Sequence, residues 1–507
     1  MHKSYVIGID IGTQGTKGTC FSGSGEKISE AFISSRLIKP GPGMVEEDPE
    51  DQVDSVCGVI RRCVKEGSVD PKDVHGIAID GQMAGIIGIG EDGRHVTPYD
   101  SWLDAVRCGP WISVMNEKAG NKILERTGGP PSINHGPKIL YWMNEQQGIF
   151  SKIRSFVQPG GYAAMRLCGL PGEKAFIDTT YLHFSGFADN RKKEWDRELC
   201  GIFGLDRGLL PEIVEPTDII GEVVSEMAEK AGIIPGIPVV AGCGDTAASF
   251  LSCGAVEEGI CIDVAGTASV FATTTSSLKP DAEKVLGCGH AAEPDLWHPY
   301  AYINGGGMNL EWYRKDIAGA LRGKPDDAPG FDDLNLEAGK ITPEETNPLF
   351  IPHLGGRVCP SMPDLRGAWL NLNWHHTPAH LFRAVLEGVA LEYGIYMRTL
   401  KRLYPSFTPS EIRITGGGEN SGVWNRMKAD SLGIPVVKLS RNEGAPLGSA
   451  IIAGTGTGLF KSIRETADEW IKTAERIEPD HNMYNFYQKR ISMFADYIDA
   501  VNAVSKK

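Results

Sequence analysis

The sequence lacks the features that mark exported and membrane proteins. Its 11 cysteines are scattered, and none forms a C-x-x-C pair. An odd number of isolated cysteines indicates reduced thiols rather than a disulfide framework. No run is both apolar and long enough to cross a bilayer, and the first residues, MHKSYVIGID, show no leader pattern. We therefore expect a cytoplasmic protein that binds no membrane.

The sequence also has no excess of positive charge. Its formal net charge is -14, which argues against a general nucleic-acid-binding surface. An anionic ligand must therefore be held locally, by backbone N–H groups, a few cations or a metal. None of the four glycine clusters described below fits the P-loop pattern or the dinucleotide-binding pattern, so neither of these phosphate sites is predicted there.

What the chain does have is length and an α/β pattern. At 507 residues it is too long for one compact core, which favours two large domains. Apolar strand candidates alternate with amphipathic helix candidates, such as residues 49–66 and 378–403. An internal repeat supports the division, because IGIDIGT at residues 7–13 recurs as ICIDVAGT at residues 260–267. Two unrelated β-hairpins remain the alternative.

The repeat and the composition predict where the domains divide. We expect an N-terminal domain over residues 1–250, a C-terminal domain over residues 251–460, and helices over residues 461–507 packed on the domains. The chain from Ser462 onward is predicted to be helical throughout, starting with a capping box made by Ser462 and Glu465. No low-complexity linker separates the domains, so they are expected to pack against each other.

Four glycine clusters follow predicted strands, at residues 12–15, 266–267, 305–307 and 416–418. A turn at such a place exposes backbone N–H groups, and the missing side chain lets a phosphate approach. Taken singly, such turns are usually structural. Four of them at strand ends, two of which are repeated, favour a nucleotide cleft between two domains.

Two aspartates stand beside these turns. Asp10 would repel a phosphate unless a divalent cation lay between them, and Mg²⁺ binds through one or two carboxylates plus phosphate oxygens. The alternative is a structural aspartate that caps its own turn. Asp245 follows a predicted strand and precedes a helix start, so it is either an N-cap or a base at the mouth of the cleft. Lys17 either faces the same phosphates or is solvated.

Taken together, these motifs resemble those of the FGGY carbohydrate kinase family, from Ile7 to about Gly454. The resemblance implies two ribonuclease H-like domains of the actin, sugar kinase and heat-shock ATPase type around a central nucleotide cleft. It also implies an ATP-dependent sugar kinase that uses Mg²⁺. The positions that match the family's ATP-binding motifs are Gly12, Thr13, Gln14, Lys17, Gly266, Thr267, Gly307, Gly417, Gly418 and Asn420.

The same resemblance assigns the chemistry and the sugar side. Asp245, in AGCGDTAA, matches the family's catalytic base, and Asp10 and Asp245 together are assigned to the metal. The positions assigned to the sugar are Gln82, Met83, Ala84, Trp102 and Asp104, with Asp245. Without the resemblance, packing in the core would be the default interpretation of Met83 and Trp102.

Four positions depart from the family's patterns. Ala84 replaces the histidine of GQMHG, the motif of xylulose kinases, and Arg107 comes one residue late after the W-x-D motif. Asn371 stands where the C-terminal signature has glycine, and Trp142 is one place late in the N-terminal signature. The departures indicate an outlying subgroup with an unchanged fold.

The predicted reaction is phosphorylation of a terminal hydroxyl of a sugar, with a ketopentose such as xylulose as the first candidate. Ribulose, erythritol, glycerol or another polyol is the alternative within the class. An actin-like or chaperone-type ATPase, which needs no sugar pocket, is the alternative of another class. The expected partners are ATP and a small sugar or polyol, with no nucleic acid. The sequence leaves the oligomeric state open, with a homodimer as one candidate.

Overall fold

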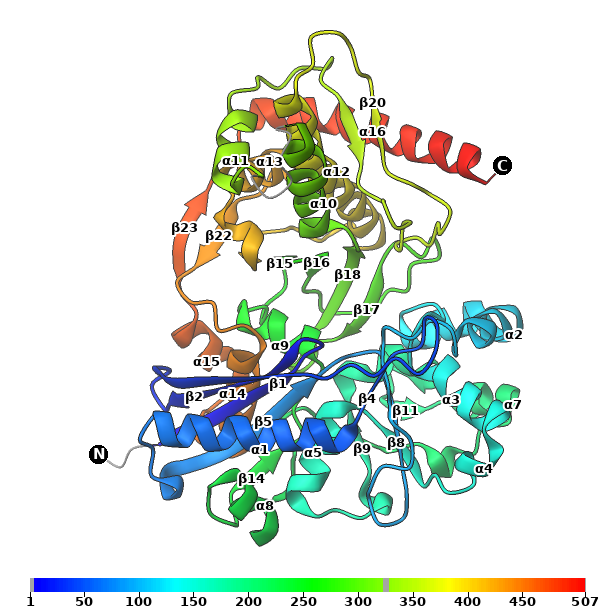
Figure 1. Ribbon diagram of the computed structural model, residues 1–507, viewed down its shortest axis with the longest axis vertical. Coiled ribbons are helices and arrows are strands. Elements are labelled where there is room, and N and C mark those ends of the chain that lie inside the picture. The colour runs from blue at the N-terminus through cyan, green and yellow to red at the C-terminus, as the bar shows by residue number, and fades with distance from the viewer. Residues whose placement is uncertain (1–3, 322–327, 507) are drawn as a thin grey trace.

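The computed structural model describes residues 4–321 and 328–506, which form two lobes, each built on a large mixed β-sheet (Figure 1). The strands of the N-terminal sheet are, in spatial order, β13 (Ile219–Glu222), β14 (Pro238–Val240), β5 (Val74–Gly81), β1 (Tyr5–Ile11), β2 (Gly15–Ser22) and β3 (Lys27–Ser34). The strands of the C-terminal sheet are β17 (Gly287–His290), β18 (Trp297–Ile303), β16 (Ser269–Thr273), β15 (Ile260–Ala265), β21 (Glu411–Thr415), β22 (Val436–Leu439) and β23 (Thr473–Ile477).

Helices cover both sheets and fill the space beside them. The main helices are α1 (Pro49–Glu66), α2 (Gly109–Thr127), α3 (His135–Glu145), α5 (Pro159–Cys168), α9 (Asp245–Ser252), α10 (Gly306–Trp312), α11 (Phe331–Gly339), α12 (Pro378–Leu403), α13 (Gly422–Leu432), α14 (Ala445–Gly456), α15 (Ile463–Trp470) and α16 (His481–Ser505). Short elements that matter below are β4 (Glu46–Glu47), β7 (Tyr99–Asp100), β20 (Ala368–Leu370) and the 3₁₀ turn η7 (Gly417–Asn420).

Strand β1 is buried on both faces, and its alternation assigns each face to a helix. Ile7 and Ile9 belong to the core that α1 covers, whereas Val6 belongs to the core that α14 covers. Gly8 is on the α14 side, where a Cβ atom would collide with the carbonyl oxygen of Pro446. The missing side chain therefore lets α14 lie directly on the strand. Asp10 has the same parity as Gly8 and is directed toward the α14 side of the sheet.

The packing of α14 crosses the expected domain limits. It lies between β22 and β23 of the C-terminal sheet in sequence, yet it packs against β1 and β5 of the N-terminal lobe. The expected domain limits at residues 250 and 460 therefore stay a prediction. Residues 445–456, which that division gives to the C-terminal domain, pack in the core of the N-terminal lobe.

The internal repeat is confirmed in the pairing of the strands. In the first copy, β1 pairs antiparallel with β2 and parallel with β5. In the second copy, β15 pairs antiparallel with β16 and parallel with β21. Each copy therefore occupies the same place in its sheet, which two unrelated hairpins would not require.

The prediction of a wholly helical C-terminal segment was wrong at Thr473–Ile477. Helix α15 begins as expected, since the Ser462 hydroxyl accepts a hydrogen bond from the Glu465 amide at 3.1 Å. The chain then forms β23, which pairs antiparallel with β22. This strand covers the edge of the C-terminal sheet and is largely exposed. It has no buried face, and so it lacks the apolar alternation that would have indicated a strand.

All cysteines are free, as the sequence predicts, and ten of them are buried. Among the helices of residues 4–321 and 328–506, none combines the length and apolar character of a membrane span.

Candidate active site

Three carboxylates meet at one edge of the N-terminal sheet. Asp10 lies near the end of β1, and Asp80 lies directly opposite it near the end of the parallel strand β5. Asp245 begins α9, just after β14, the other parallel neighbour of β5. A bridge between Gly81 and Gly244 continues this pairing up to Asp245. Carboxyl ends of adjacent parallel strands form the usual ligand-binding edge of an α/β sheet.

Burial disfavours the charged form of all three groups, and the charge of Asp10 adds repulsion at Asp80 and Asp245. Burial raises the pKa of Asp10 to about 6. Burial, followed by the charge of Asp10, raises the pKa of Asp245 to about 7. Burial and the charge of Asp10 also raise the pKa of Asp80 well above its ordinary value. The cluster therefore gains from any positive charge placed next to it.

The donor set fits a magnesium ion completed by its substrate. The Oδ1 atoms of Asp10 and Asp80 are buried and have no hydrogen-bond partner, which leaves carboxylate oxygens available. In the part of the chain that the structure describes, no group of three or more His, Cys, Asp or Glu side chains forms a ready metal site. Mg²⁺ needs few protein ligands, because it keeps several waters and binds phosphate oxygens.

The aspartate in the second copy of the repeat is neutralised by a lysine. Asp263 occupies the position in β15 that Asp10 occupies in β1, but it is fully buried and forms an ion pair with Lys428. The Tyr393 hydroxyl donates a second bond to it at 2.7 Å. The ammonium group of Lys428 lies 3.7 Å from the centre of the Trp424 ring, a cation–π contact. The carboxylate available to a cation is therefore in the N-terminal copy.

The turn between β1 and β2, which carries the first glycine cluster, is tight. The Gly12 amide donates to the Gly15 carbonyl at 3.1 Å, and the Gly15 amide donates back to Gly12 at 3.3 Å. The turn carries Thr13 and Gln14 at its tip. Lys17 is directed elsewhere, because its ammonium group is 3.0 Å from Glu30 and donates to the Glu443 carbonyl at 3.0 Å. Its contact with phosphate therefore remains a prediction.

The other nucleotide-side glycines gather at the end of β15. The Gly307 amide donates to the Gly266 carbonyl at 2.9 Å, and the Met308 amide donates to the Thr267 carbonyl at 3.0 Å. The turn η7 carries Gly417, Gly418 and Asn420. It lies against the same strand end, where a Cβ atom on Gly418 would collide with Ala265. Three of the four glycine clusters are thus adjacent, as a nucleotide site in the C-terminal lobe requires.

Two residues assigned to the sugar, Met83 and Trp102, contact Gly244 and Thr13. Met83 packs against Gly244, the residue before Asp245. A Cβ atom on Gly244 would collide with the sulfur of Met83. The Trp102 indole donates to the Thr13 hydroxyl at 2.9 Å. Trp102 is 43% exposed, so it is not a core residue. Met83 is buried in a small core cluster and contacts Gly244. Ala84 follows it at the half-exposed surface.

Gln82 and Asp104 are held more tightly than expected. Gln82 is buried, and its amide donates to Glu47 at 2.9 Å. Asp104 is fully buried, and its Oδ1 accepts the amides of Val106 at 3.0 Å and Arg107 at 3.1 Å. Asp104 thus organises its own loop, and its direct contact with a sugar remains a prediction. The shifted Arg107 forms ion pairs with Asp104 and with Glu46 of β4.

Sequence reasoning missed Asp80 and Lys138. Lys138 is fully buried, and its three donors reach Asp100 at 2.6 Å, the Ser101 carbonyl at 2.9 Å and the Asp104 carbonyl at 3.1 Å. It therefore holds the loop that carries Trp102. The signal for Asp80 was available, because AIDG at residues 78–81 repeats the strand, aspartate and glycine order seen at Asp10. Lys138 could not have been predicted, because its bonds to two carbonyls of a distant loop leave no pattern in the sequence around it.

Comparison with known proteins identifies the family and the fold of the chain. Models of the FGGY family of carbohydrate kinases match the chain, the N-terminal domain over residues 5–252 and the C-terminal domain over residues 263–457. The chain is 26% identical over 497 residues to a xylulose kinase from Bacillus subtilis, covering 97% of this chain and 96% of that protein. It is 28% identical over 473 residues to a gluconokinase from Bacillus subtilis, covering 92% and 90%.

A solved structure shows the same fold. The ligand-bound xylulose kinase from Lactobacillus acidophilus superposes with a TM-score of 0.90 over 99% of both chains, at 24% identity. The predicted two-domain α/β kinase fold is therefore confirmed. The alternative of a chaperone-type or actin-like ATPase is excluded, since both matched models are those of carbohydrate kinases.

Proposed function

The chain belongs to the FGGY family of carbohydrate kinases, and on that premise we propose that it phosphorylates a terminal hydroxyl of a ketopentose such as xylulose. The observation that carries the proposal is the contact of Met83 with Gly244, which joins the sugar-side motif to the candidate base Asp245. A hydroxyl bound beside Met83 would lie next to a carboxylate able to accept its proton.

Each residue has a defined part in this proposal. Asp245 orients the attacking hydroxyl and accepts its proton, and a pKa raised to about 7 suits a base that works near neutral pH. Asp10 holds Mg²⁺ through water, and the bound ion offsets negative charge on the phosphoryl group. Gly12, which has no side chain, lets the phosphates approach the turn, and Thr13 contacts them. Asp245 also borders the metal.

Charge favours a neutral sugar over a sugar acid. A carboxylate substrate such as gluconate calls for a free cation, often a bidentate arginine. The two cations beside the sugar-side loop are both occupied: Lys138 by Asp100 and two carbonyls, and Arg107 by Glu46 and Asp104. This occupancy supports xylulose, or a related ketose or polyol, over gluconate.

The test is a panel of substrates assayed for ADP release. D-xylulose, D-ribulose, erythritol, glycerol and gluconate are compared by kcat/KM at fixed Mg·ATP. The proposal expects a neutral ketopentose or polyol to give the highest value, with gluconate at least about tenfold lower, roughly 1.4 kcal/mol in transition-state binding. Gluconate as the best substrate would contradict it.

The free and mostly buried cysteines support a reducing compartment. We therefore retain the cytoplasm as the proposed location. A homodimer likewise remains a proposal.

A further inference from the structure

Thr180 bonds the backbone directly before the candidate base. The amide of Gly244, the residue before Asp245, donates to the Thr180 hydroxyl at 2.9 Å. Both Gly244 and Thr180 are buried, and Thr180 is only 1% exposed. Within residues 4–321 and 328–506, the carboxylate of Asp245 is bonded only by its neighbour Thr246, at 3.1 Å. The backbone at Gly244 therefore sets the direction in which this carboxylate points.

The hydrogen bonds of the Thr180 hydroxyl have a fixed direction. An amide N–H can only donate, so the hydroxyl accepts from Gly244 and gives its own hydrogen to Oδ1 of Asp178. The Thr180 amide donates to the same oxygen at 2.9 Å. Burial raises the pKa of Asp178 to about 7. Oδ1 accepts in both protonation states, because a neutral carboxyl carries its proton on the other oxygen, so the arrangement does not depend on the charge of Asp178.

Tyr181 holds the other side of the same backbone bridge. Gly81, at the end of β5, forms a bridge with Gly244. The buried hydroxyl of Tyr181 donates to the Gly81 carbonyl at 2.8 Å. Thr180 and Tyr181 both belong to the 3₁₀ turn η3 (Thr179–Tyr181). This one turn thus holds both sides of the bridge that precedes the candidate base.

We propose that Thr180 is a positioning residue that sets the direction of the Asp245 carboxylate through the Gly244 amide. Its hydroxyl fixes the backbone from which the base projects, so that the carboxylate meets the attacking hydroxyl in a productive geometry. A displacement of about 1 Å at a reacting group lowers a rate by as much as about 10²-fold. The inference rests on the proposed function, because it takes Asp245 as the base.

The test is Thr180→Val, which keeps the size of the side chain and removes the acceptor of the Gly244 amide. Its kcat for the best sugar is expected to fall at least about tenfold, while the KM for ATP and the KM for the sugar change less than about threefold. Thr180→Ser keeps the hydroxyl, and its kcat is expected to stay within about threefold of the native value. Circular dichroism and urea unfolding establish that each variant is folded.

Thr97 provides a matched control in the same lobe. It is 1% exposed, and its hydroxyl accepts the Gly88 amide at 2.8 Å and donates to the Pro98 carbonyl at 2.8 Å. Gly88 lies in β6 (Ile87–Ile89), which carries no residue assigned to the site. Thr97→Val therefore removes a bond of the same kind. It is expected to destabilise the protein as well, but to change kcat less than about twofold.

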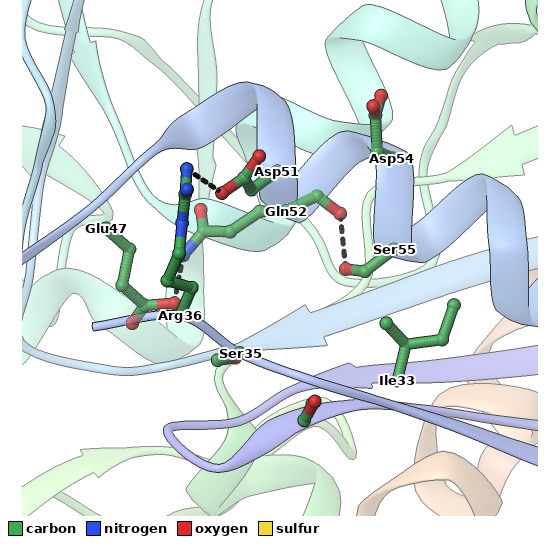
Figure 2. A pocket seen from close by; sticks show the side chains of 9 residues that line it. Ile33, Ser35, Arg36, Glu47, Asp51, Gln52, Asp54 and Ser55 are labelled. Atoms are coloured by element: carbon green, nitrogen blue, oxygen red, sulfur yellow. Dashed lines mark hydrogen bonds and ion pairs between the residues drawn. The ribbon is translucent and has the colours of Figure 1, made fainter. Parts of the chain in front are cut away.

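A second control lies on the other face of the N-terminal sheet. The cavity of about 270 Å³ in Figure 2 is beside α1, whereas α9 packs in the core that α14 covers. Asp54 lines this cavity, is exposed and pairs with Lys230. Asp54→Asn is expected to leave kcat and both KM values unchanged, because it alters a polar group that has no bond to the bridge.

Three results would overturn the proposal. One is a fall in kcat of less than about tenfold in folded Thr180→Val, whatever the change in KM. Another is an equal fall in Thr97→Val or in Asp54→Asn. The third is a Thr180→Ser variant as slow as Thr180→Val.

Tyr181→Phe decides the matter if Thr180→Val does not fold. It removes the hydroxyl on the other side of the bridge, so kcat is expected to fall at least about threefold at an unchanged KM for ATP. An unchanged kcat in this variant would overturn the proposal. A native enzyme that phosphorylates no sugar in the panel would contradict the proposed function instead.

Discussion

Asp10 and Asp80 face each other across the parallel strands β1 and β5. The Ser449 hydroxyl of α14 donates to Asp80 at 2.5 Å, so a helix from the second half of the chain contacts this pair of aspartates. One oxygen of each aspartate has no partner. Two adjacent carboxyls resist double ionisation unless a cation neutralises them. We therefore expect a cation to bind beside the pair.

Replacing Asp10 by alanine should change the magnesium dependence of the reaction. Phosphoryl transfer depends on the metal to offset charge on the phosphate, so the variant should need at least about tenfold more Mg²⁺ for half-maximal rate. Initial rates over a magnesium titration at saturating sugar measure this. An unchanged dependence in a variant that circular dichroism shows to be folded would leave Asp10 a structural residue.

The rate should depend on the protonation of Asp245. A base works only when deprotonated, and burial with the nearby Asp10 charge raises its pKa to about 7. The kcat/KM for the sugar should therefore fall about tenfold per pH unit well below 7 and level off above it. A profile from pH 5 to pH 9 measures it. A flat profile down to pH 5 would show that no group with a raised pKa acts as the base.

Lys138→Met should destabilise the protein far more than the loss of an exposed lysine. It leaves Asp100 buried and without its cation, and breaking a buried pair costs about 3–5 kcal/mol. Lys122→Met is the control, because its pair with Glu198 is exposed and is worth about 0–1 kcal/mol. Urea unfolding compares the two. Equal losses would contradict the structural role assigned to Lys138.

Ala84 should broaden the choice of sugar. A histidine there offers a polar group to a substrate hydroxyl, whereas alanine offers only a methyl group. We expect the native enzyme to prefer D-xylulose less than about 100-fold over other ketopentoses and polyols, which is roughly 2.7 kcal/mol. Ala84→His should shift the ranking in the same kcat/KM panel. A native preference above that limit would contradict the expectation.

The sequence predicted those features that local patterns determine. Residues 49–66 and 378–403 form α1 and α12 with the expected limits, because their apolar spacing is strong and each helix starts with proline. The repeat predicted both hairpins. The departure at Asn371 also has a local cause: its φ is 63°, a region that favours glycine and tolerates asparagine. Its side-chain amide donates to the Thr346 carbonyl at 3.1 Å.

Long-range features could not be predicted in this way. The contact of α14 with Gly8 joins residues more than 400 positions apart and depends on a surface that only the folded sheet creates. The bonds of Lys138 to Ser101 and Asp104 depend on the path of a loop. The hydrogen bond that Gln82 donates to Glu47 joins residues 35 positions apart in the chain. None of these partners is marked by spacing or composition.

The central claim, that Asp245 is the base of a sugar kinase, is tested most directly by the turnover of Asp245→Asn. The measurement is kcat for the best sugar in the native enzyme and in the variant, with ATP affinity determined by calorimetry on both. General-base catalysis contributes about 10²–10⁴-fold, so kcat should fall by at least about 100-fold while the Kd for ATP changes less than about threefold. A fall in kcat of less than tenfold would contradict the account and leave Asp245 as the first residue of a helix with no catalytic part.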